Sequence, residues 1–373
     1  MKRNIEKKAA IILLISLFFW IPVCQSIVAD NPAGCTTLFV DDDNTNGPWD
    51  GTQEHPYQYI QDAVDVAGNG DTVFVYSGLY QENIRIETSI TVIGGDKETT
   101  IVDGDHGRET SFLIKTDYVT ITGFTLQNTG TGVYIGGPGS TASHKTITEN
   151  NIVNANCGID VYYGNPHKPE FIDAGYNTIS ANTIRNTIFY AIRIVKGCNN
   201  MITGNSISEN HGSEEGIGRY GFGIDVSGAY NNISYNHVFN NERFGIIIGE
   251  TFHTTVYRNT VEETGLYGLA IVLGSFDTIK QNNFLANRRH AVFVQPLQLM
   301  LQTYFRPYPI FPSLWNKNYW DSPRRTPYVI PGFVGCNGLV ASVIWNQLDV
   351  YPVNWMRFDW HPAQEPYDIR GGA

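Results

Sequence analysis

The sequence contains none of the short cysteine motifs that hold zinc or iron–sulfur clusters. Five cysteines occur in 373 residues and no two of them form a CxxC pair, which excludes a metal site of that kind. Methionine and histidine are scarce, with four and nine scattered residues, so the Met, Cys and His clusters that handle copper are absent. Acidic residues outnumber basic ones, giving a formal net charge of −11. This charge offers no electrostatic basis for binding nucleic acid or anionic lipid.

The chain also lacks a hydrophobic run long enough to span a membrane. The run from Ala9 to Val23 is shorter than the about 20 residues that a spanning helix requires. It follows four basic residues and precedes small residues near Ser26 and Ala29. This order predicts a secretory signal peptide over residues 1–29, and hence a secreted or cell-surface protein. An uncleaved signal anchor is the alternative, and the only membrane contact that we expect. Cleavage would remove four positive charges and one negative charge, changing the formal charge from −11 to −14.

What the sequence does contain is a sixfold repeat between Ile147 and Phe284. Each copy has a β-branched residue, two variable residues, an asparagine, one variable residue and an apolar residue. Eight or nine residues after most of these asparagines comes Gly or Ala followed by apolar-x-apolar. The asparagines, at spacings of 32, 23, 31, 23 and 23 residues, are Asn150, Asn182, Asn205, Asn236, Asn259 and Asn282.

This repeat predicts an all-β protein folded as a right-handed parallel β-helix. A unit of two or three short strands cannot bury its apolar face alone, but it can when stacked on copies of itself. We expect the asparagines to turn the strand in the αL conformation and to point inward, where their amides bond one another in a ladder. A leucine-rich repeat is the alternative, but its Leu-x-x-Leu-x-Leu core is absent.

Both ends of such a solenoid need a cap. Apolar residues at helical spacing within 59–67 predict a short capping helix. We therefore expect an N-terminal segment and capping helix over 30–70 and the β-helix over 71–296. Aromatic residues and prolines cluster beyond Pro296, which predicts a C-terminal cap over 297–373. A carbohydrate-binding platform of exposed aromatic rings is the alternative for that segment.

The repeats, together with the segments Gly70–Asn83, Asn318–Asp321 and Thr326–Ile330, resemble the NosD-like β-helix repeat family. That family belongs to the pectin-lyase-like superfamily, and its repeats are also described as carbohydrate-binding and sugar-hydrolysis domains. The resemblance covers residues 36–330, is of the exported archaeal type, and implies a carbohydrate partner. The namesake serves copper-site maturation, a minor alternative here because copper-binding residue types are scarce. Relatives often carry an Asp/Gly-rich stretch where this chain has Ser322–Arg325, so no calcium role carries over from it.

A row of charged residues is the candidate catalytic site. In Gly-Ile-x-Val the residue x faces outward, toward solvent, and in three consecutive coils it is Asp160, Arg193 and Asp225. We expect the guanidinium to lie between the two carboxylates. In the next three coils the outward residues are Ile247, Ala270 and Phe293. Four further residues, on the same row or in two inserted loops, are the candidates for substrate binding: Tyr163, Lys196, Arg219 and Tyr220.

Such a row is either a site that acts on polysaccharide or a set of surface ion pairs without a chemical role. An inverting hydrolase needs two carboxyls about 6.5–9.5 Å apart, and a lyase needs a cation and a base. A surface ion ladder without chemistry is the alternative, and the Asn-Thr-Asp, Asp-Asp and Gly-His-Gly motifs of polygalacturonases are absent. The leading prediction is an exported protein that binds polysaccharide or cell-envelope glycan, or supports the envelope, without catalysis. A polysaccharide lyase, hydrolase or epimerase is the alternative.

One further segment has metal-binding spacing. Asp42, Asn44, Asn46 and Asp50 match positions 1, 3, 5 and 9 of an EF-hand calcium loop, but Gln53 replaces the bidentate glutamate at position 12. Short Asp/Asn/Gly runs are also typical of turns. We expect no cofactor, with calcium at these four residues as the alternative.

Overall fold

The computed structural model describes residues 35–104, 109–137, 143–162, 175–212, 220–296, 313–323, 326–335 and 350–369. The predicted signal peptide and two of the candidate residues, Tyr163 and Arg219, lie outside the described residues. Those that are described belong to one compact unit, which begins at Cys35. In this part of the chain no helix is both long and apolar enough to cross a membrane.

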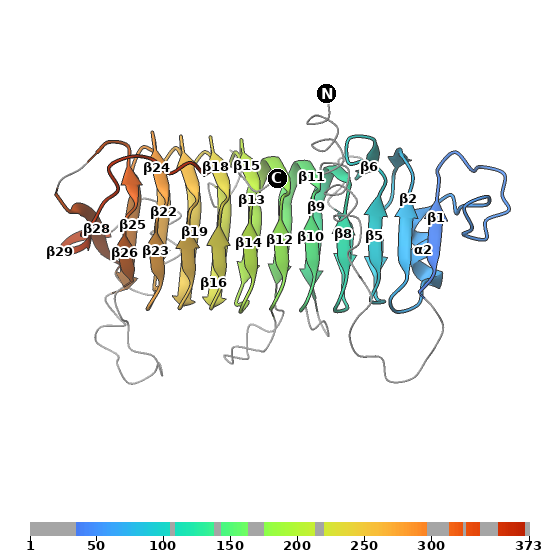
Figure 1. Ribbon diagram of the computed structural model, residues 1–373, viewed down its shortest axis with the longest axis horizontal. Coiled ribbons are helices and arrows are strands. Elements are labelled where there is room, and N and C mark those ends of the chain that lie inside the picture. Colours follow the sequence, from blue (N-terminus) through green and yellow to red (C-terminus); the bar gives the residue numbers. More distant parts are fainter. Residues whose placement is uncertain are drawn as a thin grey trace, which may run out of the picture. The chain divides into compact units, whose positions relative to one another are not determined.

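Eleven parallel strands, one from each turn of the chain, form the first face of a coiled ribbon, as Figure 1 shows. Each strand contributes only a few residues, because the chain must bend at once to begin the next face. In their order across the sheet the strands are β1 (Thr37–Val40), β2 (Thr72–Val75), β5 (Thr91–Gly94), β8 (Thr120–Thr122), β10 (Thr146–Thr148), β12 (Thr178–Ser180), β14 (Met201–Thr203), β17 (Asn232–Ser234), β20 (Thr255–Tyr257), β23 (Thr278–Lys280) and β26 (Leu314–Asn316).

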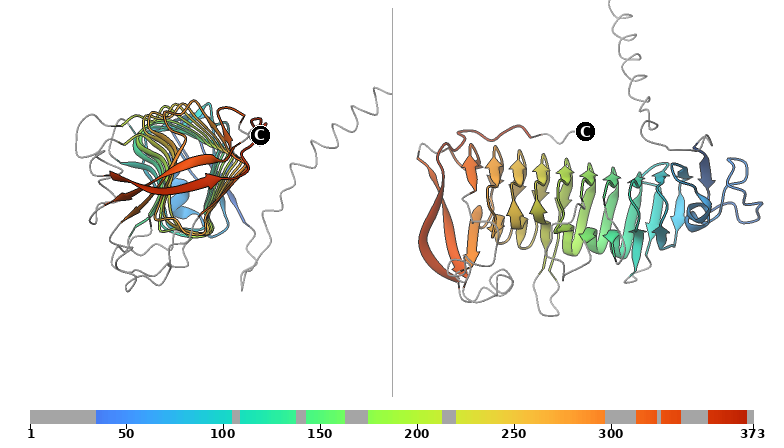
Figure 2. Two further views of the ribbon diagram at one scale, coloured as in Figure 1. Left: turned by 90° about the vertical axis from the view of Figure 1, so that its left-hand side faces the viewer. Right: turned by 90° about the horizontal axis from the view of Figure 1, so that it is seen from below.

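The other strands form a second and a third face, and successive coils superimpose when seen end-on (Figure 2). Three long strands bend to serve both faces: β9 (Thr125–Gly136), β11 (Asn151–Tyr162) and β13 (Thr183–Val195). The second face also has β3 (Gly78–Tyr80), β6 (Thr100–Asp103), β15 (Ser206–Ser208), β18 (His237–Phe239), β21 (Thr260–Glu262), β24 (Asn283–Leu285) and β27 (Tyr319–Trp320). The third has β4 (Ile84–Ile86), β7 (Thr110–Ile114), β16 (Phe222–Ala229), β19 (Phe244–Phe252), β22 (Tyr267–Val272), β25 (Ala291–Pro296) and β28 (Tyr328–Gly335), which pairs antiparallel with β29 (Val350–Asp359).

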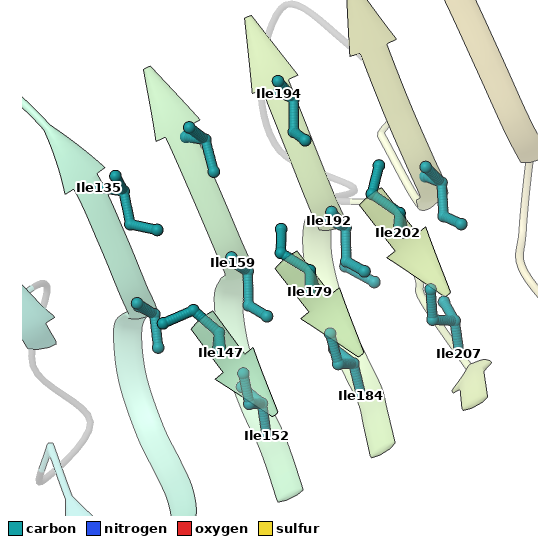
Figure 3. Close-up of a cluster of buried hydrophobic side chains, with 14 of the residues drawn as sticks. Ile135, Ile147, Ile152, Ile159, Ile179, Ile184, Ile192, Ile194, Ile202 and Ile207 are labelled. Carbon is teal, nitrogen blue, oxygen red and sulfur yellow. The ribbon is translucent and has the colours of Figure 1, made fainter. Parts of the chain in front are cut away.

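In-register columns of aliphatic side chains fill the interior (Figure 3). Ile147, Ile179 and Ile202 pair across the first face. Parallel columns stand on the other two faces, Ile152–Ile184–Ile207 and Ile159–Ile192–Ile224. Each of these side chains is fully buried, and burial of one such side chain contributes about 1.5–3 kcal/mol. The β-branched positions of the repeat therefore supply the core, as the sequence predicts.

The asparagine ladder is confirmed. All six predicted asparagines are buried, and each Nδ2 donates to the Oδ1 of the next, at 3.2 Å from Asn150 to Asn182 and at 3.0 Å for the other pairs. The expectation that the asparagines themselves adopt αL was wrong. The residue before each one has positive φ, for example Ala181 (53°) and Arg258 (51°). That preceding residue makes the corner, so that the asparagine can point inward, donate to the asparagine of the next coil and accept from that of the preceding coil.

Two further ladders run parallel to the first, five residues before and five residues after it. Asn177, Asn200 and Asn231 form one by the same bonds, and Asn210 and Asn241 belong to the other. The sequence analysis missed both, although Asn recurs at intervals of five in 200–210 and 231–241. Three columns of buried amides thus hold successive coils in one register.

Both caps have clear structural elements. At the start, helix α2 (Ile60–Val66) buries Ile60, Ala63 and Val64, while Tyr59, which was predicted to belong to the apolar stripe, is exposed. At the other end the buried ring of Trp320 stacks on Phe284 at 4.7 Å between centroids and on Tyr328 at 4.1 Å. The central ladder ends there too, since Asn318 donates to the Asp359 carboxylate at 3.0 Å. Residues 297–312 of the predicted cap lie outside the described residues.

Candidate functional site

The charged row lies on the outside of the third face, on three consecutive coils. Strand register pairs Asp160 of β11 with Arg193 of β13, and Arg193 with Asp225 of β16. The predicted order, with the guanidinium on the middle coil, is therefore present. The next outward positions are occupied by Ile247 and Ala270.

The prediction that Phe293 belongs to the outward row was wrong. The position paired with Ala270 is Val292, whereas Phe293 pairs with Ile271 and belongs to the core. The coil of β25 places Ala291 opposite Leu269 rather than opposite Gly268, so this coil is one residue shorter here than the preceding one. A shift of one residue turns every side chain of a strand to the opposite face.

Arg193 and Asp160 form a bidentate ion pair. Nε of Arg193 donates to one carboxylate oxygen at 2.9 Å, and Nη2 donates to the other at 2.5 Å. The Asp160 side chain is only 6% exposed and that of Arg193 is 28% exposed. The expectation that Asp160 faces open solvent was therefore wrong, because the guanidinium on the next coil lies against it. The pairing uses two of the five N–H donors of the guanidinium, which leaves donors for a further partner.

Asp225 is the chemically distinct member of the row. Desolvation by burial raises the pKa of Asp225 to about 6; the Arg193 charge lowers this pKa, and the Asp160 charge raises it. The side chain still has some exposure to solvent. Among the described residues, no hydrogen bond reaches its carboxyl. At neutral pH this group is therefore largely ionised, and within the described residues it accepts no hydrogen bond.

An aromatic row borders the charged one on the same outer face. Tyr190, Phe222, Phe244 and Tyr267 pair in register on successive coils and belong to a second hydrophobic cluster outside the helix core. The guanidinium of Arg193 lies over the Tyr190 ring at 4.8 Å from its centroid, an arrangement that is attractive in itself. The sequence analysis missed this row, although each of these residues immediately precedes the Gly or Ala of the repeat.

Burial keeps the neighbouring acidic groups protonated. Desolvation, followed by the Asp160 charge, raises the pKa of Cys157 to about 12, so its thiol is no nucleophile at neutral pH. Desolvation, and then the Asp225 charge, raises the pKa of Tyr190, and the pKa of Tyr134 is raised by desolvation and by Asp160. The two aspartates and Arg193 are therefore the charged groups that these side chains surround, with a formal sum of −1.

The structure describes two of the four predicted substrate-binding residues, Tyr220 and Lys196. Tyr220 lies at the site, because its ring packs edge-on against Phe189 at 4.6 Å and against Tyr190 at 5.8 Å between centroids. Lys196 is exposed and follows β13 directly, with its backbone N–H donating to Ser227 Oγ at 2.8 Å. Tyr163 and Arg219 lie outside the described residues.

The predicted calcium ligands have other partners. Asp42 accepts a backbone hydrogen bond from Leu79 at 2.9 Å, and Asn44 Nδ2 donates to the carbonyl oxygen of Pro56 at 2.7 Å. Asp50 accepts from the backbone and side chain of Thr52, as in an Asx turn, and Asn46 contacts the neighbouring Thr45 hydroxyl. In the part of the chain that the structure describes, no three His, Cys, Asp or Glu side chains cluster as a metal site. These bonds favour the turn interpretation, and calcium binding here stays a prediction.

The comparison with protein families decides the handedness of the coil. The family described as "Right handed beta helix region" matches residues 110–285. This match and the parallel sheets described above confirm the right-handed parallel β-helix. Residues 110–285 include the whole charged row and all six predicted asparagines of the ladder. No curated protein matches the sequence at a significant level.

Several solved structures have similar folds. XylC in complex with xylose has a TM-score of 0.54 and 14% sequence identity, over 70% of this chain and 69% of that one. A pectate lyase has a TM-score of 0.43 and 11% identity over 78% and 72% of the two chains. The A-module of a mannuronan C-5 epimerase from Azotobacter vinelandii has a TM-score of 0.44 and 16% identity over 74% and 87%. At these identities the similarity is one of fold.

Proposed function

We propose that this protein is an exported, cell-envelope β-helix protein that binds glycan on the third face without cleaving it. The site is the outer surface of β11, β13 and β16, where Asp160, Arg193 and Asp225 border Tyr190 and Tyr220. Its ligand is an uncharged saccharide. Arg193 is neutralised by Asp160, so Asp225 leaves the row with a net negative charge that repels uronates.

One observation carries the proposal: among the described residues Asp225 is an ionised, partly desolvated acceptor without a donor, beside an arginine that retains unused donors. A desolvated polar group without a partner is costly, and that cost is recovered when a ligand supplies the missing donor. Sugar hydroxyls both donate and accept, so one hydroxyl pair can satisfy Asp225 and Arg193 together. The partly exposed ring of Tyr220 lies beside them and packs on the buried ring of Tyr190.

A similar fold is consistent with this choice of ligand. XylC, whose coil resembles this one, holds xylose in its solved complex. The proposal that the partner of this chain is a glycan agrees with that complex, but it rests on the Asp225–Arg193 pair. The saccharide of the test below is chosen for the same reason: xylose units carry hydroxyl groups and no charge.

A titration panel tests the proposed function. Xylohexaose, hexagalacturonate and hexamannuronate are titrated into the full chain by calorimetry, with and without calcium, and the mixtures are then analysed for products. We expect xylohexaose to bind, the two uronates to bind more weakly, and no product to form. Asp225→Asn should weaken binding about tenfold, the value of one charge-assisted hydrogen bond. Asp62→Asn, on the exposed surface of α2, is the matched control. Equal affinity of Asp225→Asn and the wild-type protein would contradict the proposal.

Catalysis is the second candidate, favoured by the pKa of Asp225 near 6. Such a value suits a general acid or base, because the group can hold or release a proton close to neutral pH. A lyase, hydrolase or epimerase would release or isomerise product in the same panel, with a rate that changes near pH 6 and is lost in Asp225→Asn. Product formation by the wild-type protein would establish this candidate in place of the first.

A further inference from the structure

A second row of rings runs along one corner of the coil, where the third face turns into the first. Seven residues with φ near 57° occupy equivalent positions there: Tyr118, His144, Tyr176, Asn199, Tyr230, His253 and Phe276. Backbone hydrogen bonds connect their coils in that order, as in Tyr176 N–H to Cys198 O (3.1 Å) and Asn199 N–H to Ala229 O (3.0 Å). We call this row the corner stripe.

Neighbouring rings of the corner stripe stack face to face. Tyr176 lies on His144 at 5.3 Å between centroids with planes 6° apart, and Tyr230 lies on His253 at 5.4 Å, also 6° apart. These distances are within the range of favourable offset stacking. The stripe is interrupted at a single coil, that of Asn199. Each tyrosine has one face against its histidine, so its other face is turned toward the Asn199 coil.

The interruption has the dimensions of one more ring. Tyr176 and Tyr230 are two coils apart, about 10 Å at the usual spacing of stacked strands. A ring midway between them would lie about 5 Å from each, which is the spacing of the stripe itself. Both tyrosines are open to solvent, with exposures of 54% and 55%. Asn199 is exposed, and within the described residues its side-chain amide makes no hydrogen bond.

We propose that Tyr176, Asn199 and Tyr230 form a clamp for a single pyranose ring of a glycan. The two ring faces hold the C–H faces of the sugar, and the Asn199 amide exchanges hydrogen bonds with its hydroxyls. This inference rests on the proposed function for its ligand class, and it assigns a second subsite at a different place on the coil.

The clamp lies on the same three coils as the charged row. Asp225 precedes Tyr230 by five residues, and Arg193 precedes Asn199 by six, so the two subsites are at most about 20 Å apart along the chain. A hexasaccharide can therefore occupy both. Each subsite can also be removed separately, because different residues carry it.

Filling the interruption tests the clamp. Asn199→Tyr completes the stripe with a ring, at a backbone conformation that tyrosine already adopts in Tyr118, Tyr176 and Tyr230. We expect this variant to fold, to keep or raise its melting temperature, and to bind xylohexaose about tenfold more weakly or worse, the loss of two stacking contacts. Asn199→Ala keeps the space open and should lose less affinity. Tyr118→Ala, at the far end of the stripe, should bind as the wild-type protein does.

The outcomes separate the two proposals. Unchanged affinity of Asn199→Tyr overturns the clamp, and if Asp225→Asn then weakens binding, the third-face site stands alone. Loss of affinity in Asn199→Tyr but not in Asp225→Asn supports the clamp and overturns the third-face site. If Asn199→Tyr does not fold, Tyr176→Ala and Tyr230→Ala replace it, and unchanged binding by both overturns the clamp. A wild-type protein that binds no saccharide overturns both proposals.

Discussion

The guanidinium of Arg193 binds the carboxylate of Asp160 through two parallel hydrogen bonds, across neighbouring coils of the third face. The other neighbour of Arg193 in the same register, Asp225, has no such bond among the described residues. The row is therefore asymmetric: one carboxylate is neutralised and nearly buried, while the other is charged and available. This asymmetry distinguishes the row from a regular surface ion ladder, whose members would be equally solvated.

The Arg193–Asp160 pair should matter for stability. Arg193→Ala leaves the Asp160 charge buried and unpaired, and we expect it to lower the free energy of unfolding by about 2–4 kcal/mol. The double variant Asp160→Asn with Arg193→Ala also removes the unpaired charge of Asp160. It should therefore recover part of the lost free energy of unfolding. Chemical denaturation of the three proteins measures the difference. Equal stability of Arg193→Ala and the wild-type protein would show that the pair is only a solvated surface contact.

Asp225 should make stability depend on pH. Its folded-state pKa of about 6 is higher than the value of about 4 in an unfolded chain. Between these values the folded state binds more protons, so this group's contribution to stability falls as pH rises from 4 to 6. Asp225→Asn should therefore be more stable than the wild-type protein at pH 7, by about 1–3 kcal/mol, and equally stable at pH 4. A difference between the two proteins that does not change with pH would refute the raised pKa.

The stability of the protein should depend on each side-chain amide of the asparagine ladder. Asn205 donates to Asn236 Oδ1 at 3.0 Å and to Ile179 O at 2.9 Å, and it accepts from the Asn182 side chain at 3.0 Å. Asn205→Ala leaves several buried groups unpaired and should cost about 3 kcal/mol or more. Ser206→Ala, at the next and outward position, should be close to neutral. Thermal unfolding compares the two, and equal shifts in melting temperature would be inconsistent with the ladder.

The residue before each ladder asparagine carries backbone strain. Ala181 has φ of 53°, a conformation that costs a residue with a Cβ about 1–2 kcal/mol relative to the right-handed helical region. The equivalent position in the next coil is Gly204, with φ of 66°. Ala181→Gly should therefore stabilise the protein by about 0.5–1 kcal/mol. Ala191→Gly, at a fully buried position of the third face without positive φ, should destabilise it. Destabilisation by both substitutions would show that the corner is not strained.

The sequence was sufficient to predict the coil and its main ladder, because each depends on residues that recur at fixed positions. Ile179, Asn182 and Ile184 lie within one short copy, and stacking places every copy in the same environment. The position of positive φ was not predictable by residue type, since Ala181, Tyr235 and Arg258 adopt it despite their side chains. There the stacked neighbours, and not the local preference, determine the backbone.

The candidate site was predictable in its order but not in its chemistry. The order Asp160, Arg193, Asp225 follows from the repeat. The pairing that buries Asp160 against Arg193 and the desolvation that raises the pKa of Asp225 depend on how neighbouring coils pack, which no alternation of inward and outward residues indicates. The prediction for Phe293 failed for a different reason. Its coil is one residue shorter, which turns the side chain from the outer face to the core although the local sequence pattern is the same.

A crystal structure of the protein with bound xylohexaose is the most direct measurement of the central claim. We predict saccharide density on the outer surface of the third face, with hydroxyl groups within hydrogen-bond distance of the Asp225 carboxylate and the Arg193 guanidinium, and with the glycosidic bonds intact. Density confined to the aromatic C-terminal segment, or cleaved saccharide over Asp225, would contradict it.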